Sequence, residues 1–246
     1  MNRKLFVASS LSAFGLSACT GDQKGALTDR LRDTLGAAEA LNERVIDTRG
    51  MARLYTEADI DKDFRTNSLD TPTDARYINA LSNGGRGYRL PVIGLVDRTH
   101  TFTLAELRAM QLQTQITRHD CVEGWSAIGK WRGVPLAAVL AMVQPVAAAR
   151  YVVFRSFDRD DSGTEYYESL DLHQAAHPQT LLALDLNDAP IDADHGGPVR
   201  LRVPTQLGYK SAKWVRQIEL TAAFPKTLLA KGGYWEDQGY QWYAGI

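Results

Sequence analysis

This chain of 246 residues contains only two cysteines, Cys19 and Cys121, and that scarcity limits how it can fold. Cys19 lies directly after an N-terminal apolar stretch and belongs to a processing signal, which leaves one thiol in the folded part. A single thiol cannot form an internal disulfide, so Cys121 is a packed core residue, a reactive group or a metal ligand. The run from Thr114 to Ser126 around it is polar and aromatic, which argues against simple core packing.

The N-terminus has the pattern of a bacterial export signal. Arg3 and Lys4 precede an apolar stretch from Leu5 to Leu16 that is too short to span a membrane. The sequence Leu16-Ser17-Ala18-Cys19 resembles a lipobox, whose cysteine is lipidated; a plain signal peptide with a nearby cysteine is the alternative. Arg3-Lys4 is one residue away from the twin-arginine pattern, which leaves the export route open. We predict a signal peptide over residues 1–18 and an exported, periplasmic lipoprotein that contacts the membrane only through Cys19.

Composition favours an ordinary soluble globular protein. The chain has 44% apolar residues and a net charge of −1. Such a balance gives no general attraction to nucleic acid or to anionic lipid, so neither is an expected partner.

Hydrophobic periodicity predicts one β-rich mixed α+β domain after an N-terminal tether. Apolar residues from Leu27 to Val45 recur at helical spacing, so residues 19–60 are expected to form a tether with one amphipathic helix. Thr103 and Glu106 form a capping box that opens a short helix through Leu112, and Pro135 suits the first turn of another helix. Strands are expected at 90–96, 151–157, 199–203 and 214–221. No repeat or second linker divides residues 61–246.

Four segments of the sequence, taken together, resemble one protein family. They are Phe64-Arg65-Thr66-Asn67, Cys121-Val122-Glu123-Gly124-Trp125-Ser126 with Trp131, Gly133 and Pro135, His195-Gly196-Gly197-Pro198-Val199-Arg200, and Gly208-Tyr209-Lys210-Ser211-Ala212-Lys213-Trp214. In this order they resemble the sulfite-oxidase superfamily, and within it the bacterial single-domain molybdopterin-dependent oxidoreductases related to the catalytic subunit of periplasmic methionine sulfoxide reductase. The resemblance implies that residues 61–246 form a single domain with the sulfite-oxidase-type molybdopterin-binding fold and bind Mo-molybdopterin.

The resemblance also implies which residues form the site. Cys121 would be the catalytic residue and the thiolate ligand of molybdenum, a role that suits a soft sulfur donor. The pterin ends in a phosphate and presents many hydrogen-bonding edges, so it requires cations and main-chain donors. The implied cofactor contacts are Phe64, Arg65, Asn67, Ser156, Asp158, His195, Arg200, Ser211, Ala212 and Lys213. Arg202 shares a strand face with Arg200 but does not match the family contact, and we expect it on a solvated face.

Other residues have two readings each. His119 and Glu123, two residues on either side of Cys121, could relay protons or could orient the loop. His173 and His177 have zinc-like spacing, but without an evident third ligand a helix-end or surface pair is favoured. The aromatic residues of the tail, from Tyr234 to Tyr243, could line a substrate funnel, but core packing is favoured.

The family resemblance predicts a redox enzyme that transfers an oxygen atom to or from a small molecule. Sulfite oxidases carry an arginine in the metal loop, whereas this chain has Glu123 and Trp125, and a carboxylate opposes a dianion. We therefore expect an S-oxide or N-oxide rather than sulfite. No flavin, dinucleotide or haem motif is evident, so a separate electron carrier, a cytochrome or a membrane haem subunit, is expected. A monomer is expected because no dimerisation domain follows the motifs. The alternatives are a non-catalytic molybdopterin-binding lipoprotein and a thiol enzyme in which His119 activates Cys121.

Overall fold

The computed structural model describes residues 50–66, 70–224 and 231–246. These residues belong to one compact unit, Ile46–Ile246. The predicted signal peptide, Cys19, the amphipathic helix and Asn67 lie outside the described residues, so the domain boundaries proposed at residues 18 and 60 stay predictions. In the described ranges, no helix has the length and apolar character needed to cross a bilayer.

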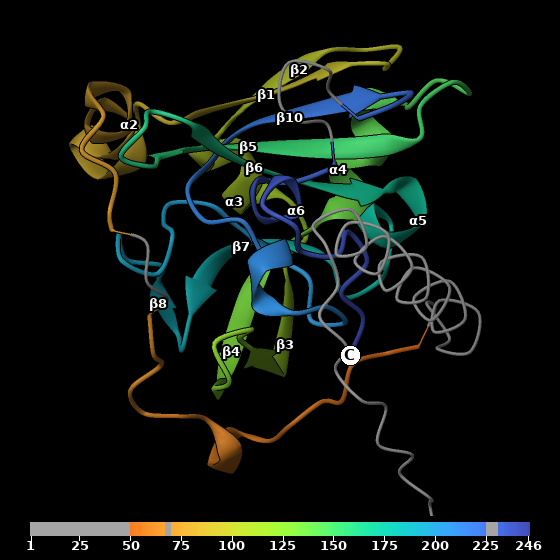
Figure 1. Ribbon diagram of the computed structural model, residues 1–246. Helices are drawn as coiled ribbons and strands as arrows, with labels where there is room; N and C mark the ends of the chain where they lie inside the picture. Colours follow the sequence, from red (N-terminus) through yellow and green to blue (C-terminus); the bar gives the residue numbers. More distant parts are fainter. Residues whose placement is uncertain (1–49, 67–69, 225–230) are drawn as a thin grey trace, which may run out of the picture. The chain divides into compact units, whose positions relative to one another are not determined.

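The first sheet has five strands in the order β2, β1, β10, β5 and β6 (Figure 1). The strands are β1 (Arg89–Gly94), β2 (His100–Thr103), β5 (Tyr151–Arg159), β6 (Glu165–Asp171) and β10 (Val215–Thr221). β1 and β10 pair in parallel, and the other neighbours are antiparallel. The strands predicted at 90–96, 151–157 and 214–221 are thus present. Two ends differ from the prediction. β1 ends at Gly94, before Leu95 and Val96, and Trp214, with a left-handed φ of 49°, lies just before β10.

The second sheet carries the hairpin that presents Cys121. Its strands are β3 (Gln113–Asp120), β4 (Ser126–Pro135), β7 (Leu181–Leu186) and β8 (Ala189–Pro190), and β9 (Arg200–Arg202) pairs with β7. The β3–β4 pairing ends with Asp120 opposite Ser126. Residues 121–125 therefore form the connecting loop, and Cys121 is its first residue. Figure 1 shows this hairpin extending away from the first sheet.

Short helices cover the sheets. They are α2 (Ala75–Gly85), α3 (Leu104–Ala109), α4 (Leu136–Val143), α5 (Leu172–Ala175) and α6 (Tyr234–Asp237), with single 3-10 turns η1 (Glu57–Asp59) and η2 (Gly208–Lys210). The predicted capping box opens α3, because the Glu106 amide donates to Thr103 Oγ1 at 3.1 Å and the Thr103 amide donates to Glu106 at 2.7 Å. This helix ends at Ala109, earlier than the predicted Leu112. The second predicted helix is α4, with Pro135 as its N-cap.

Two apolar clusters enclose the second sheet. Leu182 and Leu184 of β7 belong to the main core, which also takes side chains from the first sheet, whereas Ala183 packs with Phe64 and Trp131 in a smaller cluster. All six residues of β7 are buried, as expected for a strand covered on both faces. The fold is therefore the predicted β-rich α+β domain, and the smaller cluster supports the Cys121 hairpin from one side.

Candidate functional site

The loop that carries Cys121 is held by its own main chain. The amide of Cys121 donates to the Trp125 carbonyl at 2.8 Å, and the amide of Gly124 donates to the Cys121 carbonyl at 3.0 Å. Gly124 has a φ of +87°, a conformation that favours glycine, and this lets the chain reverse within five residues. Ser126 closes the hairpin by donating to the Asp120 carboxylate at 2.6 Å. The loop thus fixes the position of the half-buried thiol.

A cavity beside this thiol brings together segments that are far apart in the sequence. Its lining residues are His119, Cys121, Val122, Glu123, Asp158, Tyr166, Gly208, Tyr209, Ser211, Lys213 and Trp235. Four of the predicted site residues therefore meet here: the molybdenum ligand Cys121 and the cofactor contacts Asp158, Ser211 and Lys213. They come from the β3–β4 loop, from β5 and from the segment after η2.

Lys213 gives one end of the cavity its positive charge. Its ammonium group donates to the Asp194 carbonyl at 3.1 Å and lies 3.9 Å from the centre of the Trp214 ring. Burial and, to a smaller extent, the nearby Arg200 lower the pKa of Lys213 to about 7, because both disfavour the charged form. An anionic ligand would reverse this shift by pairing with the ammonium.

Two predicted contacts act on the main chain of the Lys213 segment. The Ser156 hydroxyl donates to the Lys213 carbonyl at 2.7 Å, and Ser211 Oγ accepts from the Val203 amide at 3.1 Å. Ser156 is buried but is not among the cavity-lining residues, so its hydroxyl supports the segment from behind. Ala212 is also buried, and its carbonyl accepts from the Leu201 amide at 2.9 Å. These bonds fix the backbone of residues 211–213.

Arg200 and Arg202 both stack on the indole of Trp131, each with its guanidinium carbon 5.4 Å from the ring centroid. The expected solvated position of Arg202 is wrong, because both arginines are buried where β9 passes over the smaller apolar cluster. Burial lowers the pKa of Arg200 to about 10 and that of Arg202 to about 9. Arg200 donates to the His195 carbonyl at 3.0 Å, and its Nε has no partner among the described residues. The pair therefore holds buried positive charge with unused donors.

The predicted contacts Phe64 and His195 are bonded to each other. Nε2 of His195 lies 2.7 Å from the Phe64 carbonyl oxygen, and Nδ1 lies 2.7 Å from the Asp192 carboxylate. The Phe64 ring packs edge-on against Trp131 at 5.2 Å. Neither residue lines the cavity, so both brace its surroundings. Arg65 is exposed and stacks over Trp125 at 5.1 Å, beside the Cys121 loop.

His119 and Glu123 both line the cavity next to the thiol. His119 packs so closely on Gly208 that a Cβ at that position would lie 2.4 Å from the imidazole Nε2. Burial keeps the pKa of His119 well below its usual value, so the ring is neutral. Glu123 Oε2 accepts from the Trp125 indole at 2.9 Å. Burial raises the pKa of the Cys121 thiol, and the Glu123 charge raises it further.

Sequence reasoning missed the aromatic wall of the cavity. Tyr166 donates to the Tyr209 carbonyl at 2.6 Å, and Tyr209 donates to the Gln241 carbonyl at 2.8 Å, which ties the wall to the C-terminal segment. Trp235 of α6 completes the wall and also packs, partly buried, against the main core, so both interpretations of the tail apply to this residue. The aromatic tail was the available signal, whereas nothing in the sequence marks Tyr166 within β6.

The histidine pair at 173 and 177 has a structural role. His177 is buried just beyond α5, and its Nδ1 accepts from the Gln179 amide at 3.2 Å. Over the described part of the chain, no group of three histidine, cysteine, aspartate or glutamate side chains is placed to hold a metal ion. His177 thus lies just past the end of α5, whereas His173 is exposed within this helix.

The comparisons with known proteins agree with the motif pattern. A family model described as the oxidoreductase molybdopterin binding domain matches residues 79–228. The chain is 39% identical to a putative protein-methionine-sulfoxide reductase subunit YedZ1 of Azospira oryzae, over 99% of this chain and 87% of that protein.

A solved structure, that of the sulfane dehydrogenase SoxCD from Paracoccus pantotrophus, matches with a TM-score of 0.52 and 20% identity. The match covers 70% of this chain and 51% of that one, so the chain spans about half the length of the solved relative. At this identity the match shows a common fold.

Proposed function

Because the chain belongs to the oxidoreductase molybdopterin-binding domain family, we propose that it catalyses two-electron oxygen-atom transfer on a small S-oxide or N-oxide. The domain is a molybdopterin-binding oxidoreductase with the sulfite-oxidase-type fold, and its cofactor is Mo-molybdopterin. The name of the relative from Azospira oryzae supports an S-oxide as substrate. The proposed reduction consumes two electrons and two protons, and it releases the sulfide or amine and water.

The residues around the cavity fit this cofactor. A soft thiol, Cys121, faces a cavity with the buried cation Lys213 at one end, and Arg200 nearby has an Nε with no partner among the described residues. An anionic ligand with many hydrogen-bonding edges would use such donors. Cys121 would hold the molybdenum, while Lys213 and the main chain at Ser211 and Ala212 would bind the phosphate. When bound, the cofactor supplies the redox chemistry, and the chain supplies position and electrostatics.

The acidic lining of the cavity supports the substrate class. Glu123 and Asp158 both face the space beside the thiol. A carboxylate at this position repels a dianion such as sulfite but tolerates a neutral oxide. Trp235, Tyr166 and Tyr209 offer apolar surface to the organic part of such a molecule. This acid and aromatic lining next to Cys121 is the observation that carries the proposal.

Electrons must be exchanged with a separate protein, in our proposal a cytochrome or a membrane haem subunit. The sequence shows no flavin, dinucleotide or haem motif. The relative from Azospira oryzae is named as a subunit, which supports a partner for this chain as well.

Turnover by the purified holoprotein tests the proposal. We expect S-oxide reduction with an artificial electron donor, and no sulfite oxidation with an artificial acceptor. Glu123→Gln is expected to strengthen competitive inhibition by sulfate about threefold to tenfold, because it removes one repulsive charge. Turnover of sulfite without any reduction of sulfoxides would contradict the proposal.

A further inference from the structure

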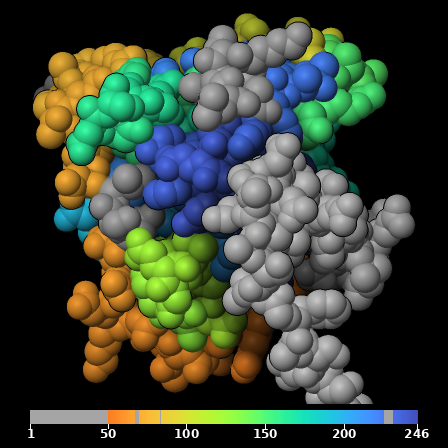
Figure 2. Space-filling view, in the orientation of Figure 1, coloured from red at the N-terminus to blue at the C-terminus, as the bar shows by residue number. Residues whose placement is uncertain are grey.

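A second hollow adjoins the cavity described above, and aspartates dominate its walls. Its lining residues are Asp70, Thr71, Pro72, Thr73, Asp74, Phe157, Asp158, Arg159, Asp160 and Asp161. Figure 2 shows the two contributing segments next to each other, residues 70–85 in orange and the β5–β6 turn in green to teal. The lining contains five carboxylates and one guanidinium, so the hollow has a negative potential that favours a cation.

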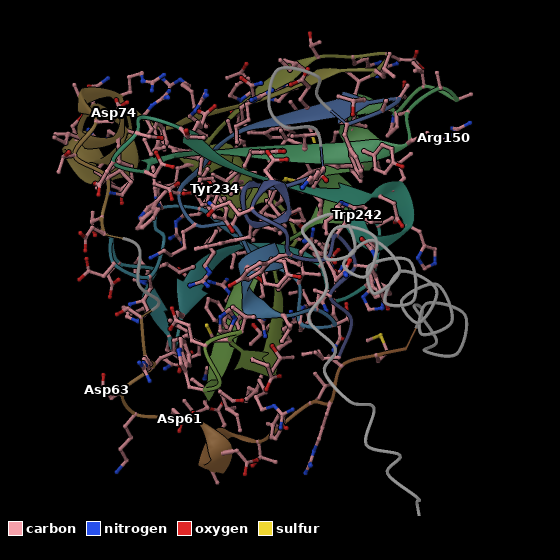
Figure 3. All side chains as sticks on the ribbon, viewed as in Figure 1. Asp61, Asp63, Asp74, Arg150, Tyr234 and Trp242 are labelled. Carbon is pink, nitrogen blue, oxygen red and sulfur yellow. The ribbon has the colours of Figure 1, made fainter. Side chains whose placement is uncertain are left out.

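Some of these carboxylates already have structural roles. Asp74, labelled in Figure 3, caps α2 and accepts from the Arg76 guanidinium at 2.6 Å. Asp160 accepts from the Tyr234 hydroxyl at 2.8 Å. Asp70 and Asp161, in contrast, are exposed at the rim of the hollow. These two carboxylates contribute to the negative potential of the hollow and have no evident role in stabilising the fold.

Asp158 is the residue that the two hollows share. It lines both of them and is only 6% exposed. Its Oδ1 is buried and has no hydrogen-bond partner among the described residues. A buried acceptor without a partner costs free energy, and a ligand that donates a hydrogen bond would satisfy it. Asp158, which the family resemblance also places among the cofactor contacts, is therefore a sign of a ligand at the junction of the two hollows.

The cofactor is a poor candidate for the acidic hollow. Its phosphate is anionic, and the buried cation Lys213 lines the Cys121 cavity but not the acidic hollow. Both Asp70 and Asp158 lie close enough to Lys213 to act on its charge, so the acidic and basic regions adjoin. A molecule that reaches the thiol cavity from the acidic side would meet carboxylates first.

We propose that the acidic hollow binds a positively charged group of the substrate, so that the enzyme favours S-oxides or N-oxides that carry a cation near the oxide. This inference rests on the proposed function and narrows its substrate class. The reacting oxide lies in the Cys121 cavity, and the cation lies among Asp70, Asp158 and Asp161. A concave hollow that joins the site suits a side chain or a small molecule better than a flat protein surface.

Three capped tripeptides test this on the holoenzyme: methionine sulfoxide flanked by two lysines, by two glutamines or by two glutamates. We expect kcat/KM to fall in that order, with about a tenfold span at low ionic strength. The span should shrink between about 0.01 and 1 M salt, because salt screens the exposed charges. Equal kcat/KM for all three peptides would overturn the inference.

Variants locate the effect. The double variant Asp70→Asn, Asp161→Asn should lower kcat/KM for the lysine peptide about threefold to tenfold and leave the glutamine peptide unchanged. Asp97→Asn is the matched control, because Asp97 is exposed and lines neither hollow. If the double variant instead slows electron delivery from a cationic cytochrome and leaves all three peptides unchanged, the hollow is a docking surface and the inference fails.

A binding measurement tests the acidic hollow separately from the proposed catalytic function. The same three peptides built on methionine sulfone can be titrated into the holoprotein by calorimetry, without turnover. Preferential binding of the lysine peptide, lost in the double variant, supports the acidic hollow even if no sulfoxide is reduced. Reduction of sulfoxides without any charge preference leaves the proposed function intact and removes this inference.

Discussion

At the scale of single residues, the site contains one buried acid, Asp158, and one buried base, Lys213, in surroundings that disfavour the charged form of each. Burial raises the pKa of Asp158 to about 7, and it lowers the pKa of Lys213 to about 7. Each pKa shift indicates that the charged group has lost its hydration and that protein groups do not fully compensate for this loss. A bound anion beside Lys213 and a cation beside Asp158 would both reverse these shifts. The two residues therefore mark the places where a bound ligand would stabilise the charged side chains most.

The raised pKa of Asp158 predicts a pH-dependent stability of the protein prepared without cofactor. Ionised Asp158 destabilises the folded state, so this penalty is absent below the unfolded pKa of 3.8 and complete above about pH 7. Asp158→Asn removes the penalty. The free energy of unfolding of the variant, relative to the native chain, should rise by about 2–4 kcal/mol between about pH 4 and pH 8.

Urea unfolding at several pH values measures this difference. Asp97→Asn provides the control, because Asp97 is exposed and its substitution relieves no buried charge. A constant difference for Asp158→Asn would show that Asp158 ionises normally in the folded protein.

At the scale of elements, the parts of the site that sequence reasoning missed are held by tertiary contacts. The β3–β4 hairpin is marked by its motif, and α3 by its capping box. In contrast, η2 and α6 are too short for periodicity to reveal. A buried cluster joins them: the Lys210 ammonium donates to Glu236 at 2.6 Å and also to Glu168 of β6. The neighbours of Lys210 and Glu236, namely Tyr209, Ser211 and Trp235, line the cavity.

Loss of this buried cluster should destabilise the protein. Lys210→Met leaves Glu168 and Glu236 buried without their cation, and we expect the free energy of unfolding to fall by about 3–5 kcal/mol. Lys130→Met is a matched control, since Lys130 also bridges two carboxylates, but those of Glu57 and Asp188 are exposed. Its cost should stay below about 1 kcal/mol. Equal unfolding midpoints in denaturant for both variants would contradict the importance of the buried cluster.

At the scale of the whole molecule, the sequence predicted the class of fold and the cofactor better than the shape of the cavity. Motif order indicated the family, and apolar patterning indicated β1, β5 and β10 of the first sheet and β9 of the second, but none of the other strands. Four of the residues implied by the resemblance, Cys121, Asp158, Ser211 and Lys213, line one cavity. Phe64, Ser156 and His195 instead support the cavity from behind, because their hydrogen bonds are made to main-chain atoms and Asp192. Motif matching indicates that a residue belongs to the cofactor site, but it does not distinguish a residue that lines the cavity from one that supports it from behind.

The burial of Arg202 and the position of Trp235 follow from packing that a linear pattern does not contain. Alternation along 199–203 correctly placed Arg200 and Arg202 on one face, but that face meets Trp131 rather than water. Trp235 reaches the cavity only because the C-terminal segment returns to β6 and η2. Both features arise where segments distant in sequence pack together.

The central claim is that the Cys121 thiolate is a ligand of molybdenum. X-ray absorption at the molybdenum edge tests it directly, on purified native protein beside Cys121→Ala. We predict molybdenum in the native protein and, in the variant, either one sulfur neighbour fewer or no bound metal, with redox turnover lost in both cases. The same sulfur shell in both proteins, or full turnover by Cys121→Ala, would contradict the account.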